Sequence, residues 1–160
     1  MNRRELARAL SNPESIVSAE RPSEPWCVLG VTGAPGVGKS CLVDHIVQKW
    51  LDMGERVAIL AVDPSSPITG GALLGDRMRM SSVDDGESVF FRSIATRNLP
   101  GGVPSHLNRM VDLLIEQGWT KVIIETVGSG QSEIRVVAVA DRILLVEGPA
   151  RGDVNQAEKA

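Results

Sequence analysis

A glycine-rich octapeptide, GAPGVGKS at residues 33–40, constrains this chain more than any other feature. It matches the spacing G-x-x-x-x-G-K-[ST], which is the phosphate-binding P-loop. Glycines let the backbone turn tightly and approach a polyphosphate without a Cβ in the way. The backbone N–H groups form an anion-binding nest, Lys39 can reach the β- and γ-phosphates, and the Ser40 hydroxyl can bind Mg²⁺. The residues that we expect to contact the nucleotide are Gly33, Ala34, Pro35, Gly36, Val37, Gly38, Lys39, Ser40 and Cys41.

The segments on either side of this loop supply the context that the motif requires. Residues 26–31 (WCVLGV) form an apolar run that predicts a buried strand. After the loop, apolar residues recur at helical spacing, at Leu42, Val43, Ile46, Val47, Trp50 and Leu51. We expect Gly54 to close this helix as its C-cap. An ordinary Gly/Pro turn is the alternative, but the order strand, loop, helix favours a P-loop. The positive end of the helix dipole then faces the phosphates.

Composition narrows the class of protein further. A chain of 160 residues suggests one domain, and a net charge of −3 gives no basic footprint for nucleic acid. No apolar run approaches the length of a membrane span, and we see no export signal. The two cysteines, Cys27 and Cys41, lie in apolar patterns, so we expect small core residues of a reduced, cytoplasmic protein.

The remaining periodicity predicts an α/β fold. Further strands are expected at 56–62, 88–92, 121–125 and 142–146, and a second amphipathic helix over 107–115 is expected to close at Gly118. Alternating strands and helices predict a mostly parallel sheet flanked by helices, as in P-loop nucleoside triphosphatases. We expect residues 1–25 to form a short helix and a polar connector, and residues 26–160 to form the nucleotide-binding domain.

Polar residues that follow strands are the other candidates for chemistry, because ligands of parallel sheets lie beyond the carboxyl ends of the strands. Asp63 and Glu125 are expected to end strands beside the P-loop strand, where either carboxylate can hold Mg²⁺ or orient water. The alternative for Asp63 is a structural aspartate in a turn or helix cap, and the alternative for Glu125 is a strand-end carboxylate in a salt bridge. Gly128 can offer its N–H to a γ-phosphate and Gln131 can place water, unless this stretch is a plain flexible loop.

A glycine-rich stretch after the second strand adds another candidate. Residues 68–80 contain three glycines followed by Asp76 and two arginines. Asp76 can add a metal ligand in one nucleotide state, and an arginine can reach phosphate. A solvated loop is the alternative.

Four segments together resemble the methylmalonyl-CoA mutase-associated GTPases, some of which are described as arginine/ornithine transport-system ATPases or kinases. These segments are the P-loop, AVDPSSP at 61–67, TGGALLGDRMRM at 69–80 and IETVGSGQSE at 124–133. The resemblance spans roughly residues 5–159. It implies a fold of the P-loop class that includes the signal-recognition-particle GTPases.

The resemblance also implies an activity and a partner. Members of this family bind GTP or GDP with Mg²⁺, hydrolyse GTP slowly, and act as chaperones of adenosylcobalamin-dependent mutases. By resemblance, Lys39 and Ser40 hold phosphate and metal, and Asp63, Asp76 and Glu125 are the metal-site carboxylates. Residues 128–131 resemble a second switch, and residues 148–153, with Gln156 and Lys159, a further switch that senses the mutase.

One departure from the family pattern keeps alternatives open. The family reads guanine with an Asn-Lys-x-Asp motif, and the sequence stops at Ala160 before such a motif. We therefore expect a sheet that is incomplete at its C-terminal part, with an open edge that favours self-association. The alternatives to a GTPase are a non-hydrolysing or degenerate nucleotide-binding module and an ATPase or small-molecule kinase.

Overall fold

The computed structural model describes residues 1–16, 26–63, 86–95, 103–126, 136 and 138–148. Its helices are α1 (Arg3–Ala9), α2 (Lys39–Asp52) and α4 (Val103–Glu116), with short 3₁₀ turns η1 (Pro13–Ser15) and η3 (Gly86–Ser88). Its strands are β1 (Val28–Thr32), β2 (Val57–Asp63), β3 (Val89–Ala95), β4 (Lys121–Thr126) and β5 (Arg142–Leu145). Every strand that the sequence predicts is present, within a few residues of the expected bounds.

The five strands form one sheet in the order β3-β2-β4-β1-β5, and each neighbouring pair is parallel. The α/β class with a parallel sheet is therefore confirmed. The sequence-based placement of β2 beside the P-loop strand is wrong, because β4 lies between β1 and β2. The connection from β1 to β2 through α2 can place β2 beside β1 or one strand further away, and local sequence does not choose between the two positions.

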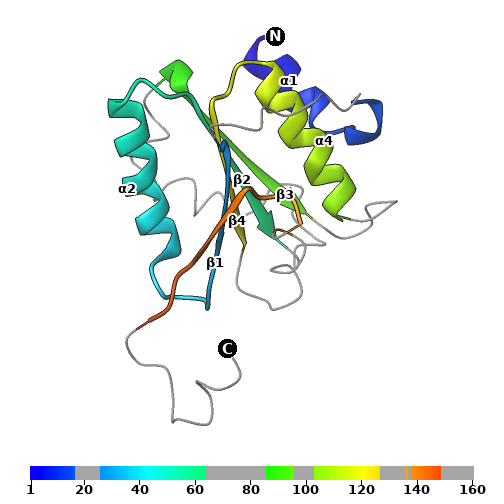
Figure 1. Ribbon diagram of the computed structural model, residues 1–160. Coiled ribbons are helices and arrows are strands. Elements are labelled where there is room, and N and C mark those ends of the chain that lie inside the picture. Colours follow the sequence, from blue (N-terminus) through cyan, green and yellow to red (C-terminus); the bar gives the residue numbers. More distant parts are fainter. Residues whose placement is uncertain (17–25, 64–85, 96–102, 127–135, 137, 149–160) are drawn as a thin grey trace.

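Helices cover both faces of the sheet (Figure 1). On one face α2 packs through Val43 and Val47 against a cluster that includes Val31, Ile59 and Ile123. On the other face α4 and α1 cover a larger cluster. Its α4 members recur at helical spacing, and they are Leu107, Met110, Val111 and Leu114. No helix in the described part of the chain is long and apolar enough to cross a membrane.

Glycines end both long helices in the same way. Gly54 and Gly118 have φ of +80° and +82°, in the left-handed region that follows many helix C-termini. In each case the next residue donates its N–H back to the last turn, from Glu55 to Trp50 and from Trp119 to Leu114. The expectation of glycine stops at both positions is confirmed.

The N-terminal segment covers the β3 edge of the sheet. Arg92 on β3 donates to the Ala7 carbonyl and the Ser11 hydroxyl, each at 2.7 Å, and Arg3 on α1 donates to the Val89 carbonyl. Burial lowers the pKa of the Arg92 guanidinium from its usual value, because desolvation disfavours the charged form. Leu6, among others, completes the contact by joining the core cluster under α4.

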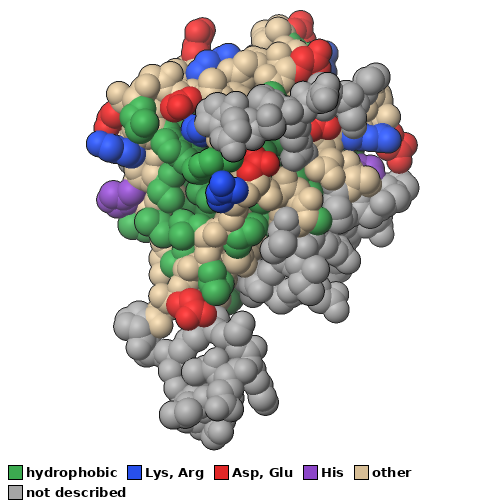
Figure 2. Space-filling view, viewed as in Figure 1, with side chains coloured by type: hydrophobic (Ala, Val, Ile, Leu, Met, Phe, Trp, Pro, Cys, Tyr) green, Lys and Arg blue, Asp and Glu red, His purple; other side chains and the backbone are tan. Residues whose placement is uncertain are grey.

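The opposite edge, β5, is more open. Ile143 and Leu145 are 41% and 52% exposed. Figure 2, which looks onto this side of the molecule, shows hydrophobic side chains gathered beside α2. The Asp141 carboxylate fixes the start of β5 by accepting the backbone N–H groups of Cys27 and Val28 at 3.0 and 2.8 Å. Strand β5 is thus held at its N-terminal end by the Asp141 bonds and along its length by pairing with β1, while Ile143 and Leu145 stay exposed to solvent.

Candidate functional site

The P-loop connects β1 to α2, as the sequence predicts. Strand β1 ends at Thr32, and α2 begins at Lys39 with Gly38 as its N-cap. Gly33, Gly36 and Gly38 have φ of +140°, +78° and +92°, so the loop needs glycine at these three positions. The first turn of α2 contains no acidic residue that would oppose an anion.

The base of the loop is held tightly against the end of β5. A Cβ on Gly33 would overlap the carbonyl oxygen of Val146 and lie 3.0 Å from its carbonyl carbon. The Val146 N–H in turn donates to the Thr32 carbonyl at 2.8 Å. The first glycine of the motif is therefore required by the neighbouring backbone as well as by its own φ.

Lys39 lies inside the loop that precedes it. Its side chain is 7% exposed, and its Nζ donates to the carbonyls of Gly33 and Ala34 at 2.7 and 2.8 Å. An ammonium carries three N–H donors, so these two bonds leave one for another acceptor. The loop carbonyls therefore hold the Lys39 cation in place inside the loop.

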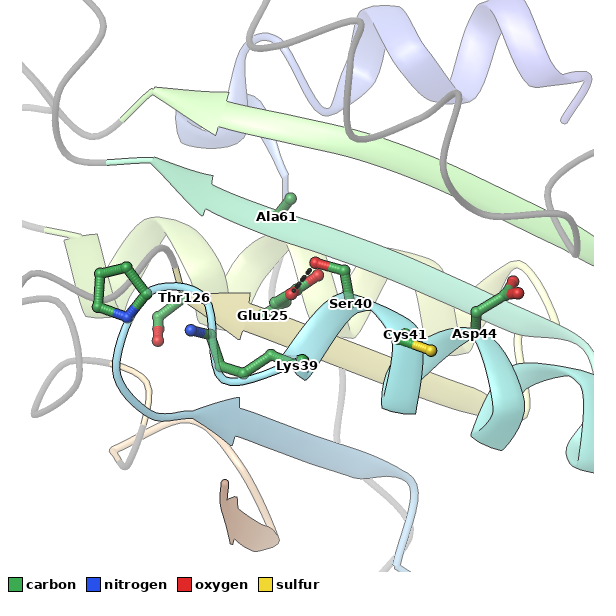
Figure 3. A pocket seen from close by; sticks show the side chains of 10 residues that line it. Lys39, Ser40, Cys41, Asp44, Ala61, Glu125 and Thr126 are labelled. Atoms are coloured by element: carbon green, nitrogen blue, oxygen red, sulfur yellow. Dashed lines mark hydrogen bonds between the residues drawn. The ribbon is translucent and has the colours of Figure 1, made fainter. Parts of the chain in front are cut away.

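Ser40 and Glu125 meet across the site from different elements. The Ser40 hydroxyl on α2 donates to Oε1 of Glu125 on β4 at 2.8 Å, the bond drawn in Figure 3. Glu125 is 7% exposed. A hydroxyl and a carboxylate oxygen are the hard ligands that Mg²⁺ prefers, so this donor pair fits the predicted magnesium site.

A cavity of about 430 Å³ opens over these side chains (Figure 3). Seven predicted residues line it, and they are Pro35, Gly36, Gly38, Lys39, Ser40, Cys41 and Glu125. Cys41 is exposed, so the expectation that it is a core residue is wrong; it starts the outward face of α2, whereas Cys27 is buried as predicted.

Three residues of the cavity were missed by the sequence reasoning, namely Asp44, Ala61 and Thr126. Asp44 lies one helical turn after Ser40, so its spacing could have identified it. Thr126 is fully buried, and its hydroxyl lies 3.4 Å from the Thr32 hydroxyl. It follows Glu125 directly and ties the end of β4 to the entrance of the P-loop.

The structure describes the other predicted site residues only in part or not at all. Asp63 is the last residue of β2, where it pairs with Ala95 on β3. In the sheet, β2 lies two strands away from β1. Strand β2 ends at the same edge of the sheet as β4, but the Asp63 side chain lies outside the part of the chain that the structure describes. Asp76, Gly128 and Gln131 lie outside the described residues, and so do Gln156 and Lys159. Their roles stay predictions.

Comparison with known proteins places the chain in a family. The family model described as "Methylmalonyl Co-A mutase-associated GTPase MeaB" matches residues 16–160. The chain belongs to the MeaB family. Among its relatives, GTPase ArgK of Escherichia coli is 39% identical over 133 residues, which cover 81% of this chain and 40% of ArgK. The fused isobutyryl-CoA mutase of Nocardia farcinica is 45% identical over 137 residues, covering 82% of this chain and 12% of that protein.

A solved structure supports the fold assignment of this MeaB-family chain. The signal recognition particle receptor FtsY from Elizabethkingia anophelis matches with a TM-score of 0.54 at 18% identity, covering 90% of this chain and 47% of FtsY. The chain thus shares the parallel α/β fold of FtsY. It spans about 40% of the length of the GTPase relatives that it matches.

Proposed function

We propose that this chain binds GTP with Mg²⁺ at the P-loop and hydrolyses it. The observation that carries the proposal is the arrangement of Lys39, Ser40 and Glu125 around one cavity at the end of the sheet. Membership of a GTPase family supports guanine as the base. Phosphoryl transfer needs positioning and charge neutralisation more than covalent chemistry, and this site offers both.

Binding follows from the loop itself. The backbone N–H groups at the start of α2 and the positive end of its dipole attract the phosphates. Lys39 keeps its bonds to the Gly33 and Ala34 carbonyls, and its third N–H is directed to a phosphate oxygen. Because the cation is already desolvated and oriented, little ordering cost remains to be met on binding.

Ser40 and Glu125 would hold the magnesium ion, which neutralises phosphate charge when it is bound. We propose Asp63 and Asp76 as further carboxylates of the same site, by family resemblance. Glu125 or Asp63 orients the attacking water. We also propose that the Gly128 N–H would bind the γ-phosphate and that Gln131 would help to place the water.

We further propose that the partner is an adenosylcobalamin-dependent acyl-CoA mutase, for which this chain acts as a chaperone. Support comes from the family description, which names methylmalonyl-CoA mutase, and from relatives named as fused isobutyryl-CoA mutases. The cytoplasm as location and self-association through the open β5 edge are proposals of the same kind. The exposed Ile143 and Leu145 support the latter.

Calorimetric titration of the 160-residue chain tests the proposal. A non-hydrolysable GTP analogue and its ATP counterpart are titrated with and without Mg²⁺, and GTP turnover is then followed by phosphate release. Preference for GTP, strengthened by Mg²⁺, with measurable turnover is the expected result. Equal binding of both analogues would favour an ATPase or kinase, and binding without turnover a non-hydrolysing module. No binding to either would overturn the site assignment.

A further inference from the structure

Asp44 lines the nucleotide cavity, and the proposed function gives it no role. It belongs to α2, one helical turn after Ser40, so the two side chains project from the same face of the helix. Asp44 is half-buried, whereas its neighbour His45 is exposed. Figure 3 shows Asp44 beyond Ser40 along α2, with the Lys39 ammonium on the other side of Ser40. The cation of the cavity and this carboxylate thus lie on opposite sides of a predicted magnesium ligand.

Ala61 keeps this part of the cavity open. It lies directly opposite Glu125 in the parallel pairing of β2 with β4, and both residues line the cavity. Only a methyl group projects from Ala61, so the space beside the Glu125 carboxylate is larger than a longer side chain would leave. Ser40 and Asp44 approach the same cavity from α2. The cavity is therefore bounded here by three oxygen-bearing side chains and one methyl group.

The spacing of Ser40 and Asp44 suits a contact through water. Side chains four residues apart on a helix have Cβ atoms about 5–6 Å apart. One Mg²⁺–oxygen bond of about 2.1 Å and one hydrogen bond of about 2.7 Å together span about 5 Å. Mg²⁺ usually keeps several of its waters when it binds to protein, and those waters donate hydrogen bonds. A carboxylate one turn beyond a metal-binding hydroxyl is therefore well placed to accept one.

We propose that Asp44 is a positioning residue that accepts hydrogen bonds from the waters of the magnesium ion held by Ser40 and Glu125. It acts through those waters and does not touch the nucleotide. Its negative charge also repels the phosphates as long as the cation is absent. Asp44 therefore makes nucleotide binding depend more strongly on Mg²⁺. The inference rests on the proposed nucleotide and magnesium site, and it adds a carboxylate that neither the P-loop spacing nor the family resemblance assigned.

Calorimetric titration of Asp44→Asn with the GTP analogue, with and without Mg²⁺, tests this role. Asparagine has nearly the same shape as aspartate, but it lacks the charge and one of the two acceptor oxygens. Without Mg²⁺, the variant should bind the analogue at least as tightly as the wild type, because a negative charge near the phosphates is gone. The gain in affinity on adding Mg²⁺ should fall about tenfold, the lower end of the range for loss of a partner of this kind.

Two further variants control for charge and for the carboxylate itself. Asp52→Asn removes the same charge from the last residue of the same helix, which is exposed and does not line the cavity, and it should leave the Mg²⁺ gain unchanged. Asp44→Glu restores a carboxylate on a longer side chain and should keep most of the gain. Thermal unfolding midpoints are recorded for all variants; if Asp44→Asn fails to fold, Asp44→Ser, which also removes the charge, takes its place.

The direction of the two changes distinguishes this inference from the proposed function. A residue with a purely structural role would weaken binding by a similar factor with and without Mg²⁺. That outcome, an unchanged Mg²⁺ gain, or an equal loss of the gain in Asp44→Glu would overturn the inference and leave the proposed function intact. A wild-type chain that binds no nucleotide, or whose affinity does not respond to Mg²⁺, would overturn the proposed site and the inference with it. Loss of the Mg²⁺ gain in Asp44→Asn, with none in Asp52→Asn, is the result expected.

Discussion

Replacing Gly33 with alanine tests whether the base of the P-loop is held by backbone contact with β5. Two costs add in this variant. The φ of +140° is unfavourable for an L-residue by about 1–3 kcal/mol. The new Cβ also overlaps the Val146 carbonyl, which is backbone and is tied to Thr32, and such overpacking costs about 1–3 kcal/mol more. We expect a total loss of roughly 2–6 kcal/mol in the free energy of unfolding.

The matched control is Gly36→Ala in the same loop. Its φ of +78° carries a backbone cost of about 1–2 kcal/mol, but no described atom lies near the new Cβ. Urea unfolding, followed by the fluorescence of the three tryptophans, gives both free energies. Gly33→Ala should lose about 2 kcal/mol more than Gly36→Ala. Equal losses in the two variants would refute the reasoning, since contact with Val146 would then contribute nothing.

Other variants test the site and the start of the sheet. Lys39→Met should reduce binding of the GTP analogue at least about a hundredfold in calorimetry, because hydrogen bonds from a charged donor are strong; affinity near wild type would contradict the assignment. Ser40→Ala should abolish the strengthening of that binding by Mg²⁺, and a retained Mg²⁺ effect would exclude Ser40 as a ligand. Glu125→Gln should lower GTP turnover more than affinity, measured by phosphate release and titration, whereas equal losses would assign it to the fold. Asp141→Ala removes the acceptor of two N–H groups at the start of β1 and should cost about 1–2 kcal/mol in urea unfolding, with the exposed Asp52→Ala as the near-neutral control.

Local sequence patterns predicted most of the helices and strands of the fold. Continuous apolar runs identified β1, β2 and β4, since strands buried on both faces have no polar alternation to obscure them. Helical spacing located α2 and α4, and Gly54 and Gly118 marked their ends correctly. The order of the strands was not encoded in this way: both β2 and β4 were expected beside β1, which is right for β4 and wrong for β2.

The same difference between local sequence patterns and long-range contacts decided which parts of the site were predicted. The P-loop was predicted because it is contiguous in sequence, and Glu125 because it ends an apolar run. Contacts between distant segments were not predicted, among them Asp141 with the start of β1 and Val146 with Thr32. Cys41 was assigned to the core since its neighbours are apolar, but it lies on the exposed side of α2.

These long-range contacts support the proposed binding of a polyphosphate, because they reduce the cost of ordering a loop that is rich in glycine. The base of the P-loop is fixed from both sides of β1, by Val146 directly after β5 and by the Thr126 hydroxyl on β4. Lys39 closes the loop from within through two carbonyls. The glycines supply conformations that no other residue adopts easily, and the neighbouring strands remove the freedom that glycine would otherwise keep. Preorganisation of this kind converts more of the phosphate contact energy into affinity, and it makes that affinity depend on the strands that frame the loop.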